Sequence, residues 1–321
     1  MSISSKSRKS DKIPLIIDTD MSPDSWTAIL FAALNPNADL LAVSVSGTGE
    51  AHGPRGARNA QRLLELAGKS DIPVSYGPPK PLRGDEHFPN LMRFVVDRML
   101  WQKLPIARRS SLPVHDSIQL ISNILRKSQK KVTIAAVGPQ TNLATLLTKY
   151  PELKSKIKGI YIMGGALDAP GNIQGLSPKS DNTTAEWNFY CDPLAVKVVI
   201  DSGVPVYLVP LDATNQVPVT QNFKDRFSSI SQPAGKFVCS VINLLTARLG
   251  QKEKFYLWDP VTTACALDAS LAKFAKRKVG MVTEAGSEWG RIKYAMDGSS
   301  INVAVKVDPI KFEDTLINSL A

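Results

Sequence analysis

Short apolar runs alternate with amphipathic segments along most of this chain. The apolar runs are rich in Val, Ile and Leu and are too short for typical helices, so they predict buried strands. Strands are expected over residues 15–18, 40–45, 74–76, 132–137, 160–163 and 206–209. A helical period predicts helices over residues 25–34, 57–66, 116–125, 143–148 and 193–200. The alternation predicts right-handed βαβ units and an α/β fold, with an open, mainly parallel sheet flanked by helices.

The order of elements changes after residue 220. Helices are expected at about 234–249 and 260–267, strands near 280–283, 291–295 and 302–307, and then a final helix. The fold should therefore carry extra C-terminal strands and helices. Because no repeat and no linker-like shift of composition occurs, we predict a single domain over residues 13–321 behind a flexible basic tail at 1–12.

Two segments lack an apolar period. Residues 73–113 contain seven prolines, and residues 164–184 are polar and glycine-rich. Long stretches without regular structure inside a compact domain are usually functional loops or disordered segments. Both would leave from strand ends, so we expect them to form walls or lids of a ligand site.

The net charge of +10 and the sequence pI near 9.4 raise the question of nucleic-acid binding. Part of the excess lies in the tail, which carries Lys6, Arg8, Lys9 and Lys12 against Asp11 alone. The remaining Lys and Arg residues are scattered without aromatic interleaving. We therefore expect a solvated basic surface and no specific nucleic-acid partner.

The cysteines lie far apart without a CxxC pair: Cys191, Cys239 and Cys265. This spacing indicates neither a zinc site nor a disulfide framework. The N-terminus has no apolar segment behind its basic residues, and no later run approaches membrane-spanning length. We therefore expect a cytoplasmic protein without a membrane partner.

Three aspartates follow or end the first predicted strand: Asp18, Asp20 and Asp24. Carboxylates at the end of a parallel strand lie at the edge where open α/β sheets bind ligands. Clustered like charges repel unless a cation joins them, and a hard cation such as Ca²⁺ takes oxygen ligands. The alternative is a surface turn in which Asp24 caps the next helix.

Four other motifs end predicted strands or begin predicted helices, and each also has a purely structural interpretation. Residues 138–142 (GPQTN) offer backbone groups to a ligand, and the two glycines after Met163 allow a close approach of the backbone. Residues 186–188 (EWN) precede a helix. The structural alternative for Asp259, in WDP, is an N-cap followed by proline at the first helical position.

Taken in order, these motifs resemble the inosine-uridine-preferring nucleoside hydrolase family. The matching letters are DTDMSPDSW (18–26), GPQTNLA (138–144), MGGAL (163–167) with GN (171–172), AEWN (185–188) before DP, LDAT (211–214) and WDP (258–260). The resemblance covers about residues 13–266. It implies a Rossmann-like α/β fold and a Ca²⁺-dependent enzyme that cuts the N-glycosidic bond of ribonucleosides, giving ribose and free base.

The resemblance also implies a metal site. Asp20 would be a Ca²⁺ ligand and the general base that activates a water molecule held by the metal. Asp259 would be a second carboxylate ligand, and Thr141 would contribute its backbone carbonyl. Oxygen ligands of this kind suit Ca²⁺.

The substrate side follows from the same resemblance. The residues expected to contact the nucleoside are Asp24, Glu50, Met163, Asn172, Glu186 and Asn188, with Asp18 close by. Carboxylates and amides around the ribose would hold it and stabilise the oxocarbenium-like charge that develops during cleavage. Glu50 is expected at the edge of the base, and its alternative is a plain surface residue.

Ser25 departs from the family pattern, which has two adjacent aspartates where this chain has Asp24 and Ser25. The second aspartate is normally a bidentate metal ligand, and a neutral hydroxyl is a poorer one. Ca²⁺ takes about six to eight oxygens. Three consequences stay open: water fills the gap, Asp24 moves over, or the protein is no longer a competent hydrolase. Ser25 or Asp24 is therefore a further metal-ligand candidate.

Trp258 precedes the last predicted metal ligand, at a position where pyrimidine-tolerant members carry a histidine that acts as an acid. A tryptophan resembles the purine-specific branch, because ring stacking favours the larger π-face of a purine. The alternative is that Trp258 fills the core. The three histidines, His52, His87 and His115, match no catalytic histidine of the family.

The leading hypothesis is a Ca²⁺-dependent ribonucleoside N-ribohydrolase that prefers purines and forms a homodimer or homotetramer. A catalytically silent nucleoside- or ribose-binding homologue is the rival, because of Ser25. A third hypothesis is hydrolysis of another N-riboside, such as a nicotinamide or modified-base nucleoside.

Overall fold

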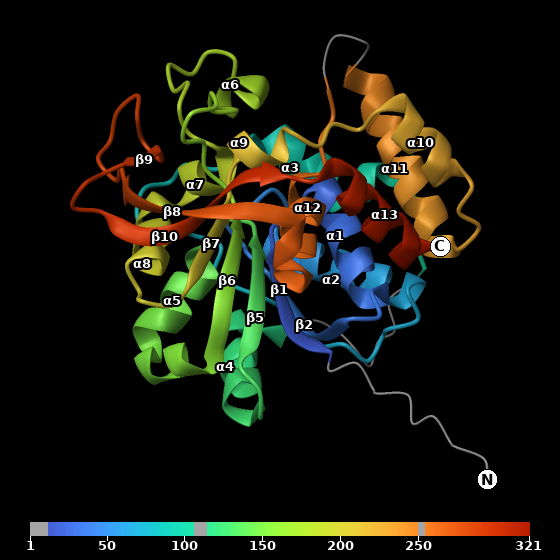
Figure 1. Ribbon diagram of the computed structural model, residues 1–321, viewed down its shortest axis with the longest axis horizontal. Helices are drawn as coiled ribbons and strands as arrows, with labels where there is room; N and C mark the ends of the chain where they lie inside the picture. Colours follow the sequence, from blue (N-terminus) through green and yellow to red (C-terminus); the bar gives the residue numbers. More distant parts are fainter. Residues whose placement is uncertain (1–11, 106–113, 250–253) are drawn as a thin grey trace.

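The computed structural model describes residues 12–105, 114–249 and 254–321. These residues form a ten-stranded sheet in the order β4-β3-β2-β1-β5-β6-β7-β10-β8-β9 (Figure 1). The strands are β1 (Ile13–Thr19), β2 (Ala38–Val45), β3 (Val74–Tyr76), β4 (Val114–His115), β5 (Val132–Val137), β6 (Ile157–Met163), β7 (Val206–Val209), β8 (Ala272–Met281), β9 (Ile292–Tyr294) and β10 (Ser299–Val307). In this order the pairs from β4 to β10 are parallel, whereas β10–β8 and β8–β9 are antiparallel. The predicted α/β fold with a mainly parallel sheet is confirmed.

Helices cover both faces of the sheet (Figure 1). One apolar cluster lies under α1 (Pro23–Leu34), α2 (Gly53–Leu66), α11 (Pro233–Leu249), α12 (Trp258–Leu267) and α13 (Pro309–Leu320), and a second under α4 (Ser117–Lys127), α5 (Thr141–Lys149) and α8 (Pro193–Ile200). Successive residues of β1 alternate between them: Leu15 and Ile17 belong to the first cluster, and Ile16 to the second. Burial on both faces explains why the central strands are continuous apolar runs.

The position of β1 decides where a site can form. β1 lies in the middle of the sheet, between β2 and β5, and pairs in parallel with both. The segments that follow these strands therefore meet at one edge of the sheet. Shorter helices lie in the connections: α3 (Asn90–Asp97), α6 (Ile173–Leu176), α7 (Trp187–Cys191), α9 (Leu211–Thr214), α10 (Gln221–Ser228), η1 (Met99–Trp101), η3 (Pro151–Lys156) and η4 (Ala269–Leu271).

The expectation of a long irregular stretch over residues 73–113 was wrong in part. This segment contains α3 and η1 as well as β3. Met92, Val96 and Met99 recur at helical spacing and pack on the first apolar cluster, but the many prolines around them mask that period. Residues 106–113 lie outside the described part of the chain. The segment 164–184 carries only the short helix α6.

The elements predicted for the C-terminal part of the chain were also wrong in part. β8 begins at Ala272, well before the predicted start near residue 280, and α10 was not expected at all. β8 pairs antiparallel on both sides and exposes several lysines, so its sequence lacks the apolar run of a buried parallel strand. The predicted strands near 291–295 and 302–307 and the final helix are confirmed as β9, β10 and α13.

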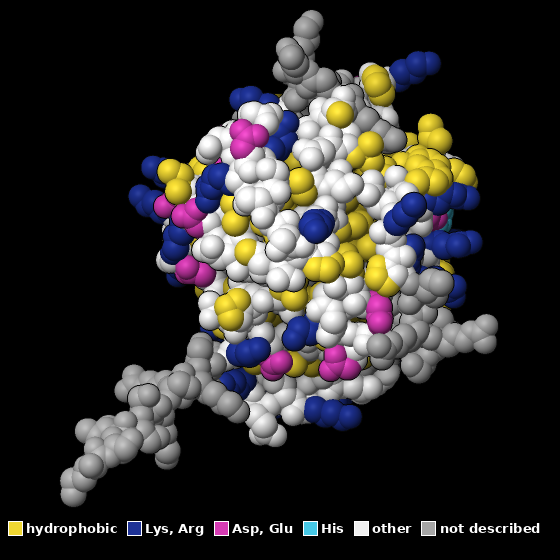
Figure 2. Space-filling view, turned by 90° about the vertical axis from the view of Figure 1, so that its right-hand side faces the viewer, with side chains coloured by type: hydrophobic (Ala, Val, Ile, Leu, Met, Phe, Trp, Pro, Cys, Tyr) yellow, Lys and Arg dark blue, Asp and Glu magenta, His cyan; other side chains and the backbone are white. Residues whose placement is uncertain are grey.

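Three expectations concern the surface and the ends of the chain. Residues 1–11 of the predicted tail lie outside the described residues, and the single domain over 13–321 stays a prediction. None of the helices in the described ranges combines the length and the apolarity that a bilayer crossing demands. On the face shown in Figure 2, the Lys and Arg side chains are scattered among apolar and uncharged ones.

Candidate active site

The carboxyl end of β1 is shaped by an unusual backbone turn. Met21 has φ of 65°, in the left-handed region that residues other than glycine rarely adopt. The Trp26 indole nitrogen donates to the Met21 carbonyl oxygen at 2.8 Å and holds the turn. Asp20 lies against two glycines: a Cβ on Gly49 would come within 2.0 Å of the Asp20 Cβ, and one on Gly138 within 2.6 Å of the Asp20 amide nitrogen. Only glycine leaves room for Asp20 here.

Helix α1 begins directly behind this turn. Ser22 is its N-cap, the Ser22 hydroxyl accepts from the Ser25 amide at 3.3 Å, and Pro23 lies in the first turn. The side chains of Asp20, Asp24 and Ser25 are buried. The alternative of an exposed turn capped by Asp24 is therefore wrong.

Asp259, which lies far from Asp24 and Ser25 in the sequence, contacts both of them in the structure. The N-cap of α12 is Leu257, so Asp259 lies inside the helix and the N-cap alternative is wrong. The Asp259 amide donates to Asp24 Oδ2 at 2.9 Å, and its carboxylate accepts from the Ser25 hydroxyl. The Ser25 hydroxyl also lies 3.3 Å from Asp20 Oδ1. One hydroxyl group thus links the two predicted carboxylate ligands.

Burial raises the pKa of each carboxyl group in this cluster of Asp20, Asp24 and Asp259. The pKa of Asp20 rises to about 6, because burial outweighs its hydrogen bonds and the Asp24 charge adds to the effect. Burial also raises the pKa of Asp24, and that of Asp259 still further, where both other carboxylates contribute. Of the ion pairs between described residues, none involves these three aspartates. No Lys or Arg of the described residues therefore neutralises these carboxylates by direct contact.

The donor set fits a hard divalent cation. Asp20 and Asp259 each contact the Ser25 hydroxyl, and all three side chains offer only oxygen atoms, the ligands that Ca²⁺ takes. Among residues that the structure describes, no three acidic, histidine or cysteine side chains group as metal ligands. Between Asp20 and Asp259, the side chain that contacts both is the neutral hydroxyl of Ser25.

Thr141 lies at the start of α5, at the same edge of the sheet. Its hydroxyl donates to Asp192 Oδ2 at 2.7 Å and lies 2.9 Å from the Thr48 hydroxyl. Its backbone carbonyl accepts from the Thr145 hydroxyl at 2.8 Å. The role of this carbonyl as a metal ligand stays a prediction.

Asp18 lies within β1, before Asp20 in the sequence, and is held by hydrogen bonds from side chains of adjacent elements. It accepts from the Ser44 hydroxyl at 2.6 Å and from Asn142 Nδ2 at 2.8 Å, in keeping with the register that pairs Asp18 with Ser44. Burial raises the pKa of Asp18 to about 7 in spite of these bonds. Asp18 is therefore a buried carboxyl group held by side chains of β2 and α5.

A second group forms after β6, around Glu186. This carboxylate accepts from the backbone amides of Gly165 at 2.9 Å, Asn188 at 3.0 Å and Phe189 at 3.4 Å. Asn188 Nδ2 in turn donates to the Met163 carbonyl oxygen at 3.2 Å. Burial raises the pKa of Glu186 to about 7, and the Asp20 charge contributes to this rise, so the two groups lie within electrostatic reach.

Asn172 joins the second group from the 164–184 segment. The Asn172 side-chain oxygen accepts from the Trp187 backbone amide at 3.0 Å, and the Asn172 backbone amide donates to the Ala185 carbonyl oxygen at 3.0 Å. These two bonds fix the loop beside the start of α7. The structure thus brings Met163, Glu186, Asn188 and Asn172 together as one group.

Glu50 and Trp258 border the acidic cluster. The Glu50 amide donates to Asp20 Oδ2 at 3.3 Å, and its side chain is only 6% exposed with Oε1 unpartnered, so the surface alternative is wrong. Trp258 is half-buried; its indole nitrogen donates to Asn215 Oδ1 at 2.9 Å. The rings of Phe255 and Tyr256 lie 5.9 and 5.6 Å from the Trp258 ring. Whether Trp258 serves the base or the core stays open.

Sequence inspection missed several supporting residues. Ser22 contacts both Asp24 and Asp259, and its place before Pro23 was a signal for an N-cap. Asp192 caps α8 and also accepts from Thr141 and from the Leu82 amide. Its position before a proline gave the same signal. Arg93, on α3, had no signal, because its helix was not expected.

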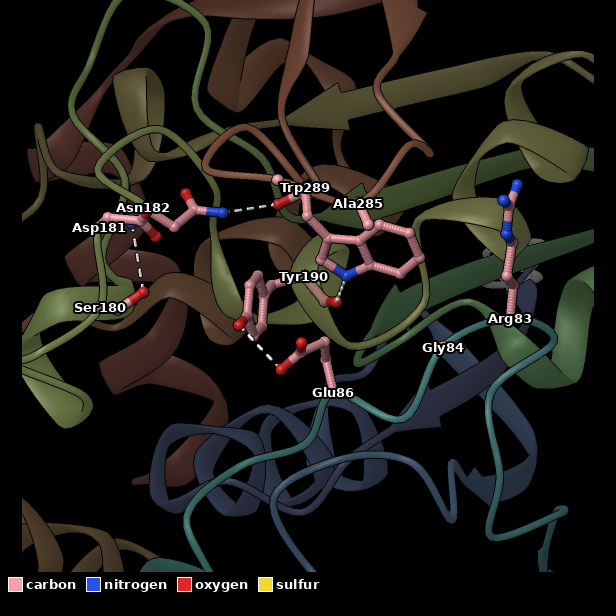
Figure 3. A pocket seen from close by; sticks show the side chains of 10 residues that line it. Arg83, Gly84, Glu86, Ser180, Asp181, Asn182, Tyr190, Ala285 and Trp289 are labelled. Atoms are coloured by element: carbon pink, nitrogen blue, oxygen red, sulfur yellow. Dashed lines mark hydrogen bonds between the residues drawn. The ribbon is translucent and has the colours of Figure 1, made fainter.

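A cavity of about 240 Å³ lies among the loops outside both groups. Figure 3 shows Tyr190 directed toward Glu86, to which its hydroxyl donates at 2.8 Å, and the Trp289 indole held by the Tyr190 carbonyl oxygen at 2.9 Å. Arg83 and Asp181 line it as well, but none of the predicted site residues does. The cavity is thus distinct from the carboxylate cluster.

Comparison with known proteins places this geometry in a family. A family profile described as inosine-uridine preferring nucleoside hydrolase matches residues 15–314. The chain is similar to the pyrimidine-specific ribonucleoside hydrolase RihA of Escherichia fergusonii, with 32% identity over 308 residues, covering 92% of this chain and 94% of that protein. RihA of Klebsiella pneumoniae is 31% identical over 323 residues, covering 96% and 98%.

Solved structures agree with this placement. The plant nucleoside hydrolase PpNRh1 superposes with a TM-score of 0.83 and 26% identity, covering 96% of this chain and 98% of that one. The purine-preferring ribonucleoside hydrolase from Gardnerella vaginalis gives a TM-score of 0.79 and 25% identity, with the same coverage. Fold and relatives define an enzyme of the ribonucleoside N-ribohydrolase class. The chain belongs to the inosine-uridine preferring nucleoside hydrolase family.

Proposed function

We propose that this enzyme hydrolyses purine nucleosides in a Ca²⁺-dependent reaction, giving ribose and free base. The observation that carries the proposal is the contact of Asp20 and Asp259 through the Ser25 hydroxyl, in a buried cluster that forms no ion pair with any Lys or Arg of the described ranges. The Asp20 charge contributes to the raised pKa of Glu186, which supports a site that both groups share.

The reaction needs a base and a set of groups that hold the sugar. Asp20, whose pKa of about 6 leaves it ionised at neutral pH, takes a proton from the attacking water. The oxygen of that water bonds to the anomeric carbon as the bond to the base nitrogen breaks, and the departing base takes up a proton. Asp24, Glu186, Asn188 and Asn172 orient the ribose hydroxyls and stabilise the developing positive charge.

Asp20 and Asp259 would hold the calcium ion, with Thr141 through its carbonyl and with Ser25 or Asp24 as a further ligand. A bound divalent cation supplies charge that orients water and sugar hydroxyls and favours loss of the water proton. The residues also explain why the cation is needed. Without a cation, burial favours the protonated forms of Asp24 and Asp259, as their raised pKa values indicate, and a bound cation favours the ionised forms that can act as ligands.

Purine preference rests on the base side of the site. Trp258 directly precedes Asp259 and, with Phe255 and Tyr256, forms an aromatic group beside the cluster. Stacking on a tryptophan favours the larger purine ring. Glu50, which carries an unpartnered buried oxygen, is the proposed acceptor at the base edge, and Met163 is the proposed further contact. The second candidate is pyrimidine hydrolysis, which the names of the RihA relatives favour.

A reducing-sugar assay over a panel of nucleosides, with added Ca²⁺ and with a chelator, tests the proposal. We expect ribose release from inosine and guanosine with Ca²⁺, slower release from uridine and cytidine, and little release with chelator. Faster release from uridine would establish the second candidate. Ribose release only from a nicotinamide or modified-base nucleoside would support the third hypothesis. Bound nucleoside without any ribose release would support the silent homologue.

Two further proposals concern the protein as a whole. We propose a cytoplasmic location, which agrees with the three free cysteines, and a homodimer or homotetramer. Light scattering coupled to size-exclusion chromatography tests the second point. A monomer at micromolar concentration would contradict it.

A further inference from the structure

Arg93 is an unusual residue in this molecule, because it is a buried cation beside an acidic site. It lies on α3 and is 8% exposed, and within the described ranges no other Lys or Arg is buried. Its Nη2 donates to the Gly47 carbonyl oxygen at 3.0 Å and to the Ala51 carbonyl oxygen at 3.2 Å. One guanidinium therefore ties both ends of the turn that connects β2 to α2, which spans residues 47–51.

This turn is the same segment that packs against Asp20. The Glu50 amide donates to Asp20 Oδ2 at 3.3 Å, and the Ala51 amide donates to the Asp20 carbonyl oxygen at 3.0 Å. Gly49 has no room for a Cβ against the Asp20 side chain. A shift of the turn would therefore move the carboxylate and remove one of its hydrogen bonds.

Asp97, one helical turn after Arg93, makes a second set of hydrogen bonds between α3 and the residues that follow the turn. Asp97 Oδ1 accepts from the His52 amide at 2.9 Å, and Asp97 Oδ2 lies 2.8 Å from His52 Nδ1. The Asp97 carbonyl oxygen accepts from Asn59 Nδ2 at 2.8 Å, which fixes α3 to α2. Residues four apart lie on one face of a helix, so Arg93 and Asp97 both face the turn from α3.

We propose that Arg93 is a positioning residue, which holds the 47–51 turn against Asp20 and so fixes the orientation of Asp20 and Glu50. Asp20 is also among the charges that act on Arg93, so the guanidinium places positive charge near the acidic cluster. The inference rests on the proposed role of Asp20 as the base. Misplacement of a reacting group by about 1 Å can cost roughly 10²-fold in rate, so a group that sets this position matters for turnover.

The test compares variants at Arg93 with a matched control at Arg98, the C-cap of α3. Arg93→Met keeps the unbranched stem and removes both hydrogen bonds. Arg98→Met makes the same change at an exposed position, where the arginine stacks on Phe94. We expect Arg93→Met to lower kcat by about 10- to 10²-fold with a smaller change in KM. Arg93→Lys should restore part of kcat, and Arg98→Met should stay within twofold of the wild type.

Amide hydrogen exchange separates this inference from the proposed function. In Arg93→Met, the amides of Glu50 and Ala51 should exchange faster than in the wild type, whereas Arg98→Met should leave them unchanged. Amide exchange can be measured on a protein without enzyme activity. If the wild type releases no ribose, the proposed function is overturned, but the effect of Arg93 on the 47–51 turn can still be measured. A folded Arg93→Met protein with wild-type kcat, or with lost kcat and unchanged exchange at both amides, would overturn the positioning role.

Asp97→Ala keeps the proposal testable if Arg93→Met does not fold. It removes the tie at His52 and leaves Arg93 in place. We expect a smaller fall in kcat than for Arg93→Met, with faster exchange of the Ala51 amide. Wild-type kcat together with wild-type exchange would show that α3 does not hold the turn.

Discussion

The acidic cluster of Asp20, Asp24 and Asp259 and the group around Glu186 are held by different contacts. In the cluster, carboxylates meet one another through the hydroxyls of Ser22 and Ser25. Backbone amides also donate to Asp20 and Asp24, but the residues around Glu186 supply its carboxylate with backbone donors in place of side-chain hydroxyls: the amides of Gly165, Asn188 and Phe189. Backbone donors hold a carboxylate in place without any added ion, whereas facing carboxylates need a proton or a cation between them.

This difference matches the two tasks that we propose for the site. The Glu186 group is preorganised by the backbone and is suited to binding the ribose. The acidic cluster depends on its charge state, and is suited to the chemistry that removes a proton from water. Changes in the cluster should therefore alter turnover most, whereas changes around Glu186 should alter stability and substrate affinity.

The largest expected effect follows replacement of the base. Asp20→Asn keeps the shape of the side chain but removes its negative charge and its basicity, so kcat should fall by at least ~10²-fold. Ribose release from inosine at saturating Ca²⁺ measures this. Asp39→Asn, at an exposed position of β2, is the control and should retain full activity. Near wild-type turnover in Asp20→Asn would refute the assignment of the base.

Trp258→Ala tests the base side next to the cluster. Loss of a stacking face costs about 1–3 kcal/mol per base, so kcat/KM for inosine should fall more than that for uridine. Trp101→Ala, which truncates an exposed tryptophan, is the control. Equal losses for the two nucleosides would mean that Trp258 only fills the core.

The pH dependence of the free energy of unfolding tests the raised pKa of Glu186, the carboxylate that backbone amides hold. The pKa of Glu186 is raised from 4.5 to about 7 by burial, so its stabilising contribution is complete below about pH 4.5 and is lost as pH rises through about 7. Glu186→Gln removes this titration. Denaturant unfolding at several pH values should therefore show the wild type losing stability relative to the variant between pH 4.5 and 7. A constant difference across that range would contradict the raised pKa.

Much of the fold could be predicted because burial leaves a pattern in the sequence. β3, β5 and β7 match their predicted bounds, since each is an apolar run between polar turns. Most of β8 and the whole of α3 were not predicted, for different reasons. β8, which lies next to the edge strand β9, exposes lysines, and the apolar residues of α3 lie among prolines that mask their helical spacing. Such elements form because of tertiary contacts, which periodicity does not record.

The candidate site could be predicted in its members but not in its contacts. The sequence motifs singled out Asp20 and Asp259, and the structure brings both against Ser25. No spacing rule could reveal that Ser22 links Asp24 to Asp259, or that Arg93 holds the turn beside Asp20. These contacts depend on the packing of segments far apart in the chain.

We propose that the acidic cluster binds Ca²⁺ with Ser25 in place of a charged ligand. Ser25→Asp restores a carboxylate between Asp20 and Asp259, and an added ligand charge strengthens calcium binding. A calorimetric Ca²⁺ titration of wild type and Ser25→Asp, with ribose release followed at limiting Ca²⁺, tests this most directly. We predict affinity tighter by roughly tenfold, equivalent to about 1.4 kcal/mol, and faster release from inosine. Unchanged affinity and unchanged turnover in Ser25→Asp would contradict the claim and favour the silent homologue.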